Sequence, residues 1–162
     1  MQKTESINRI WHILQDVKDP EIPVLSLVDL RVIRDVKVKD GYVTITMTPT
    51  FAGCPAMEQM KRDVLDSLHA NGYPEVRVET VLSPPWTTDA LTDETKERLR
   101  VFGIAAPPRK QESFEATLMV PVPCPFCGST ETKLESSFGA TLCKQLFYCD
   151  QCKQSFERFK PL

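Results

Sequence analysis

Four cysteines near the C-terminal end form two C-x-x-C pairs, a spacing that suits the binding of a metal ion. The four ligand candidates are Cys124, Cys127, Cys149 and Cys152. Each pair is expected at a tight turn where two thiolates converge, and an intervening hairpin would bring both pairs around one tetrahedral ion. A module this small has little core, so the metal would supply much of its folding free energy. The spacing predicts one structural Zn²⁺, with a four-cysteine iron–sulfur cluster as the alternative.

Cys54 is the second candidate for metal chemistry, because it lies in a turn-rich segment just before a predicted helix. Pro55 suits the first helical position, which makes Cys54 the predicted N-cap residue. Backbone N–H groups at a helix start favour a thiolate, the form that binds soft metal ions and clusters. Cys54 is therefore a candidate iron- or cluster-binding thiol, and a buried, inert cysteine is the alternative. No histidine is near it in the sequence, which disfavours a Cys–His hydrolase.

Cys143 is expected to take no part in the metal site. It precedes Cys149 by six residues in a segment with the character of a strand. Extended chain of that length separates the two sulfur atoms by roughly 20 Å. Cys143 is thus not expected to be a fifth ligand; we predict a small buried residue, with a functional thiol as the alternative.

Apolar periodicity predicts the order α-β-β-α-β-α for the first 104 residues. The first helix ends at Asp19-Pro20, and the last begins after Thr92 and ends at Gly103. Between them, the pair Asp40-Gly41 suits a two-residue hairpin turn. Closing the hairpin there places Val38 opposite Val43 and Val36 opposite Ile45, so that the apolar side chains share one face.

The predicted fold class is α+β, with a small domain followed by a C-terminal zinc ribbon. The domain is expected over residues 1–104 and the ribbon over 121–162. Residues 105–120 are rich in proline and charge and have no apolar period, so they are expected to form a linker.

Composition excludes several classes of function. The formal net charge is -2 with no basic face, which argues against nucleic-acid binding. No apolar run approaches the roughly 20 residues that cross a bilayer, so no membrane association is expected. No secretory signal is recognisable at the N-terminus, and the protein is expected to be cytoplasmic.

Four acidic residues, Asp16, Asp19, Glu21 and Asp29, cluster around the first predicted turn. Paired carboxylates can serve acid–base chemistry or a hard cation. Acidic residues beside proline are more often turn formers, however. No catalytic residue is assigned.

Several motifs together resemble a known family. The segments 19–30, Thr48-Pro49-Thr50 and Gly53-Cys54-Pro55 resemble the SufT-like domain of iron–sulfur assembly factors. The segments 85–89 and 102–108 and the four-cysteine tail are similar to one branch of it, the PaaD-type subunits of bacterial phenylacetyl-CoA epoxidase systems. One departure is Arg31, since members of the family commonly have Gly after the Asp-Leu pair, and Gly allows a backbone conformation that Arg resists.

The resemblance implies an accessory protein of a di-iron monooxygenase that epoxidises the ring of phenylacetyl-CoA, not the oxygenase itself. It implies a role in maturing the iron–sulfur cluster of the reductase component, through a transient cluster, and partnership with the reductase and oxygenase components. A non-catalytic structural or adaptor subunit is the alternative. The motif residues Asp19, Glu21, Asp29, Trp86 and Thr87 are expected to form a partner or motif surface. One thiol is one ligand and a cluster needs about four, so partner ligands or a homodimer would have to supply the others.

Overall fold

A computed structural model describes residues 2–106 and 121–160 of the chain. It divides into two compact units, Met1–Trp86 and Thr87–Leu162. Most of the expected linker, residues 105–120, lies outside the described residues. No helix within the described ranges is long and apolar enough to cross a membrane.

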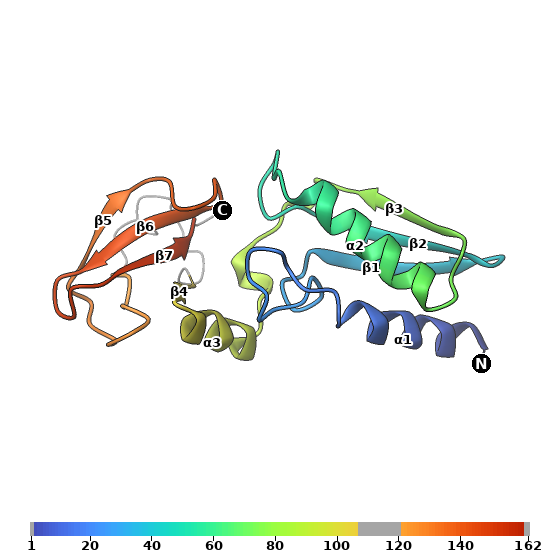
Figure 1. The fold of residues 1–162 in the computed structure, drawn as a ribbon, viewed down its shortest axis with the longest axis horizontal. Coiled ribbons are helices and arrows are strands. Elements are labelled where there is room, and N and C mark those ends of the chain that lie inside the picture. Colours follow the sequence, from blue (N-terminus) through green and yellow to red (C-terminus); the bar gives the residue numbers. More distant parts are fainter. Residues whose placement is uncertain (1, 107–120, 161–162) are drawn as a thin grey trace. The chain divides into compact units, whose positions relative to one another are not determined.

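The first unit contains two helices and a three-stranded sheet (Figure 1). In chain order the elements are α1 (Gln2–Leu14), β1 (Ile33–Lys39), β2 (Tyr42–Met47), α2 (Met57–Ala70) and β3 (Val76–Thr80). The strand order is β1-β2-β3; β1 is antiparallel to β2, and β3 is parallel to β2. Because parallel neighbours need a crossover connection, α2 links β2 to β3 and packs against β3.

The hairpin between β1 and β2 confirms the predicted turn and register. Asp40 and Gly41 both have positive φ, 51° and 84°, as the predicted turn requires. Val38 lies opposite Val43 and Val36 opposite Ile45. Because successive side chains of a strand point to opposite faces of the sheet, one face of β2 is buried. The core of the unit includes Ile10, Leu14, Val43, Ile45, Met47, Met60, Val64 and Leu68.

Arg31 adopts the left-handed conformation for which the resemblance led us to expect glycine. Its φ is 57°, and its N–H donates to the Val28 carbonyl at 3.0 Å in the turn before β1. The departure from the family pattern therefore changes the side chain but leaves the turn in place.

The second unit joins α3 to the zinc-ribbon sheet. Its elements are a short 3₁₀ helix η1 (Thr88–Ala90), α3 (Asp93–Phe102), β4 (Ile104–Ala105), β5 (Thr132–Ser136), β6 (Lys144–Cys149) and β7 (Ser155–Phe159). The strand order is β4-β7-β6-β5. As predicted, the Thr92 side chain accepts from the Thr95 N–H at the start of α3, and Gly103 ends the helix with a φ of 93°.

The division between the units differs from the expected boundary at residue 104. Ile104 and Ala105 pair with Glu157 and Arg158 of β7, which makes the chain after α3 a strand of the ribbon sheet. α3 itself is held to the ribbon by Arg100, whose Nη1 donates to the Pro125 carbonyl at 2.8 Å. Two residues of parallel pairing and one side-chain bond leave no periodic signal in a sequence, so neither was predicted.

Candidate metal centre and the Cys54 loop

The two C-x-x-C pairs form turns with the same backbone pattern. In the first turn, the Gly128 N–H donates to the Cys124 carbonyl at 2.9 Å and the Cys124 N–H donates to Ser129 at 2.9 Å. In the second, Lys153 donates to the Cys149 carbonyl at 3.0 Å and Cys149 donates to Gln154 at 2.9 Å. Gly128 and Lys153 occupy matching left-handed positions, with φ of 76° and 62°.

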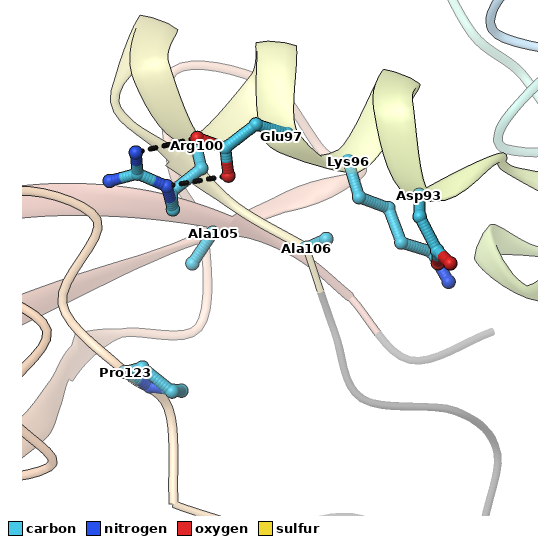
Figure 2. Close-up of a pocket in the computed structure, with 7 residues that line it drawn as sticks. All are labelled: Asp93, Lys96, Glu97, Arg100, Ala105, Ala106 and Pro123. Carbon is cyan, nitrogen blue, oxygen red and sulfur yellow. Dashed lines mark hydrogen bonds and ion pairs between the residues drawn. The ribbon is translucent and has the colours of Figure 1, made fainter.

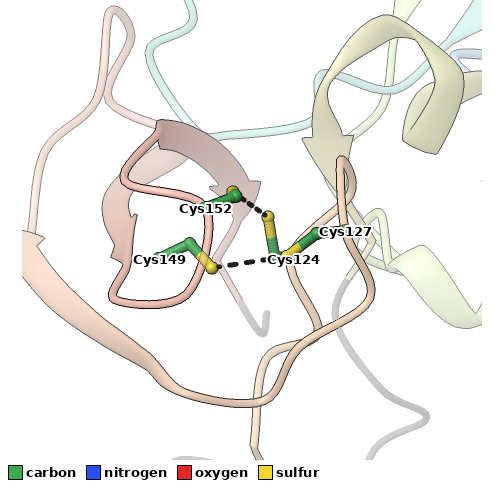
Figure 3. A group of neighbouring side chains, drawn as sticks. All are labelled: Cys124, Cys127, Cys149 and Cys152. Carbon is green, nitrogen blue, oxygen red and sulfur yellow. Dashed lines mark hydrogen bonds between the residues drawn. The ribbon is translucent and has the colours of Figure 1, made fainter.

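These turns bring the four sulfur atoms together as the spacing predicted (Figure 3). All four lie within 4.8 Å of one another. The Cys124–Cys152 sulfur distance is 3.7 Å and the Cys127–Cys149 distance is 3.6 Å. A tetrahedral zinc ion with Zn–S bonds of about 2.3 Å places its sulfur ligands about 3.8 Å apart. The four thiol donors therefore suit a four-coordinate zinc ion.

The electrostatics of the cluster also favour a cation. The pKa of the Cys149 thiol is lowered to about 7, chiefly because the Cys152 backbone N–H donates to its sulfur. Burial and then the bond to Cys149 raise the pKa of Cys152 to about 12. Neighbouring thiolates repel one another, and a positive charge among these sulfur atoms would offset that repulsion. A bound divalent ion would supply that charge and act as a structural crosslink between the two turns.

The four-cysteine cluster adjoins the small core of the ribbon. Cys124 and Cys149 are buried with Val122, Phe147 and Phe156. The rings of Phe147 and Phe156 stack with centroids 5.8 Å apart. Because this core contains few side chains, the crosslink is expected to contribute much of the stability of the sheet.

The end of α3 packs against the first cysteine turn, a contact that sequence reasoning missed. Gly103 lies beside the ring of Phe126, the residue between Pro125 and Cys127. A Cβ atom on Gly103 would lie 3.2 Å from Cζ of that ring. The sequence signal at Gly103 predicted the end of the helix but could not show what the glycine approaches.

A pocket of about 250 Å³ lies between α3, β4 and Pro123 (Figure 2). Glu97 and Arg100 at its rim form an ion pair of 2.7 Å, and Arg100 also donates to the Pro125 carbonyl. The charged groups of both side chains therefore already have partners within the second unit. We assign no ligand to this pocket.

Cys54 lies in the loop between β2 and α2, but the prediction that it is the N-cap residue is wrong. α2 begins at Met57 with Ala56 as its N-cap. Two turns precede the helix: the Cys54 N–H donates to the Phe51 carbonyl at 3.0 Å, and the Cys54 carbonyl accepts from Met57 at 3.2 Å. Cys54 thus lies two positions before the cap, where the helix dipole acts more weakly. Its side chain is half-buried and forms no disulfide.

Two of the acidic motif residues, Asp19 and Asp29, stabilise local turns. Asp19 is buried, and its Oδ1 accepts from the backbone N–H groups of Glu21 and Ile22, both at 2.8 Å. Asp29 accepts from the Ser26 N–H at 3.0 Å, while its own N–H donates to Ser26 Oγ. These bonds explain why acidic residues stand at both positions. A further role of Asp19, Glu21 and Asp29 toward a partner stays a prediction.

The remaining motif residues lie in different units. Trp86 is buried in the first unit, where Nε1 donates to the Leu30 carbonyl at 2.7 Å. Thr87 begins the second unit and caps η1, with its hydroxyl accepting from the Asp89 N–H at 3.2 Å. Both residues have clear local roles, and a partner surface at these two positions stays a prediction. Cys143 is buried, as predicted, and lies 3.1 Å from the Thr141 hydroxyl.

Comparison with known families matches each end of the chain separately. Residues 7–83 match the model of an iron–sulfur cluster assembly protein, and residues 108–160 match that of a PaaD zinc beta ribbon domain. The first range contains Cys54 and the second all four clustered cysteines.

One relative covers nearly the whole chain, and others cover a little more than half of it. A protein of Escherichia coli K12, provisionally named as a component of 1,2-phenylacetyl-CoA epoxidase, is 43% identical over 95% of this chain and 92% of its own length. The SufT auxiliary factor for Fe-S protein maturation of Staphylococcus aureus is 37% identical over 52% of this chain and 98% of its own. Among solved structures, a domain of unknown function from Bacillus anthracis covers 61% of this chain and 95% of its own, with 31% identity and a TM-score of 0.58.

Proposed function

Because the chain belongs to the family of the E. coli epoxidase component, we propose that it is an accessory protein of a phenylacetyl-CoA epoxidase. Its proposed task is to assist the assembly or insertion of an iron–sulfur cluster into the reductase component of that epoxidase. One observation carries the proposal: a domain of the iron–sulfur assembly type, with a half-buried cysteine in a loop, is joined to a zinc ribbon in one chain.

Cys54 is the residue proposed to hold iron or a cluster in transit. Its loop combines the positive φ of Gly53, 85°, with two consecutive turns, so the backbone holds the thiol at a defined place before α2. A thiolate is the ligand that iron–sulfur clusters use, and one cysteine holds a cluster only with ligands from another protein. That incomplete ligand set suits transfer better than storage.

The ribbon is proposed to dock the client protein. Its four cysteines are suited to one structural ion, which leaves Cys54 for the cargo. In this scheme the zinc keeps the docking surface folded and takes no part in cluster chemistry.

Anaerobic reconstitution with iron and sulfide tests the role of Cys54. With an excess of a small-molecule thiol to stand in for the ligands of the partner protein, we expect the zinc-loaded chain to develop the absorption of an iron–sulfur chromophore, and Cys54→Ser to lose it. Cys143→Ser is the matched control, since it removes a buried cysteine outside the cluster and should change nothing. An equal chromophore in wild type and Cys54→Ser would contradict the proposal.

The second candidate function is a structural adaptor of the epoxidase complex. The observation that favours it is that Asp19, Asp29 and Trp86 all make bonds that hold the fold. The two functions differ in one measurement, the iron content of the reductase component purified from cells that carry Cys54→Ser. Normal iron content would favour the adaptor, and a deficient reductase would favour cluster transfer.

A further inference from the structure

The outer edge of β3 presents backbone groups that have no partner within the part of the chain that the structure describes. The Val43 N–H donates to Glu75 at 2.9 Å, and the Val81 N–H donates to Met47 at 2.8 Å. In a parallel ladder, alternate residues of a strand bond to the same neighbour. Residues 75, 77, 79 and 81 therefore face β2. The N–H and C=O groups of Val76, Val78 and Thr80 point the other way, along the open edge.

The other sheet edges among the described residues are interrupted, whereas β3 is not. β1 has a register shift between Ile33 and Asp35, and β5 has one between Leu134 and Ser136. β4 is only two residues long. Such irregularities are the usual means of preventing edge-to-edge pairing. β3 keeps a continuous register with β2 over all five residues.

The side chains of β3 complement a second, antiparallel copy of the same strand. If Val78 lies opposite Val78 of the other copy, Arg77 lies opposite Glu79 and Glu79 opposite Arg77. These are non-hydrogen-bonded positions, where facing side chains come closest. Within one chain the Arg77–Glu79 pair spans 3.2 Å and is exposed, so both side chains are accessible for such pairing.

The same register satisfies the backbone and covers apolar surface. Val78 would exchange both backbone bonds with Val78 of the other copy, and Val76 would do so with Thr80. The register of β2 with β3 places Val76 and Val78 on the same face as the buried Val43 and Ile45. Both valines are only half-buried at present, and pairing would cover them further.

We propose that a second copy of this chain binds along β3, antiparallel and centred on Val78, so that the two three-stranded sheets become one continuous sheet. β5 has a similar Lys-Leu-Glu alternation, but its bulge interrupts the edge. Among the described strands, β3 alone therefore has both an uninterrupted open edge and charged side chains that would pair with those of a second copy.

Sedimentation of the full zinc-loaded chain, from low micromolar to about 1 mM, tests the proposal. We expect a concentration-dependent dimer. Arg77→Glu places like charges opposite each other at two symmetric positions and should raise the dimer dissociation constant about tenfold. The double variant Arg77→Glu/Glu79→Arg restores both pairs and should return the constant to near the wild-type value. Lys37→Glu, an equal charge change on exposed β1, is the control and should have no effect.

Hydrogen exchange gives a second readout that needs no variant. The amides of Val76, Val78 and Thr80 should exchange more slowly as the wild-type concentration rises, while exposed amides of the β5 edge should not change. A chain that stays monomeric at about 1 mM, a dimer indifferent to Arg77→Glu, or a reversed variant that fails to recover would each overturn the proposal.

Discussion

Trp86 connects the loop after β3 to the turn before β1 through one buried hydrogen bond. Its Nε1 donates to the Leu30 carbonyl at 2.7 Å, and Trp86 and Leu30 are both buried. Trp86→Phe keeps most of the ring but leaves that carbonyl without its donor, which should cost about 1–3 kcal/mol of unfolding free energy. Urea unfolding of the first unit measures the loss.

Trp11→Phe is the matched control for this prediction. Trp11 lies half-buried on α1, and its indole donates no hydrogen bond to any residue that the structure describes. Its replacement should cost clearly less than that of Trp86. Equal losses at the two positions would show that ring size, rather than the bond to Leu30, determines the stability.

The predictability of single residues depended on how local their environment is. The clustering of the four C-terminal cysteines was predicted from spacing alone, because each pair of sulfur atoms converges within a turn of a few residues. The environment of Cys54 was not, because two successive turns delay the start of α2 to Met57. Pro55 is compatible with either arrangement, so its presence could not decide between them.

At the scale of elements, local pairing was predicted and non-local pairing was not. The turn at Asp40-Gly41 determines the register of β1 and β2, and both residues are visible in the sequence. The parallel pairing of β2 with β3 depends on how α2 packs, and the pairing of β4 with β7 joins segments about fifty residues apart in the chain. No periodic pattern specifies such partners.

The junction between α3 and the first cysteine turn should be sensitive to one methyl group. Gly103→Ala combines a left-handed φ of 93° with a contact of 3.2 Å to the Phe126 ring. Gly128→Ala has a comparable φ of 76° but meets nothing within 4 Å. Both changes carry the backbone cost of about 1 kcal/mol, and we expect Gly103→Ala to cost about 1 kcal/mol more. Thermal unfolding of the zinc-loaded second unit measures the difference, and equal costs would show that Phe126 moves aside freely.

At the scale of the whole molecule, the proposed β3 pairing has a consequence for cluster transfer. The Cys54 loop follows the C-terminal end of β2, and β3 runs parallel to β2. Antiparallel pairing of two β3 strands would therefore place the two Cys54 loops toward opposite ends of the joined sheet. The two thiols would not share one cluster, and the remaining ligands would come from the client protein.

Removal of zinc should unfold the second unit and leave the first folded. The elements that lose their structure would then show where the boundary between the units lies. The ribbon core is small and includes two of the ligands, so chelation should unfold β5, β6 and β7. α3 should lose its structure as well, because Arg100 binds Pro125 of the first cysteine turn and an isolated helix of ten residues is marginal in water. The first unit, Met1–Trp86, has its own core and should stay folded. Amide exchange before and after chelation measures each element separately.

Cys127→Ser should reproduce the effect of chelation, and Cys143→Ser should not, since Cys143 lies outside the cluster. Protection of α3 that survives zinc removal would instead support a boundary near residue 104, and loss of protection in β1 and β2 would show that the first unit depends on the metal.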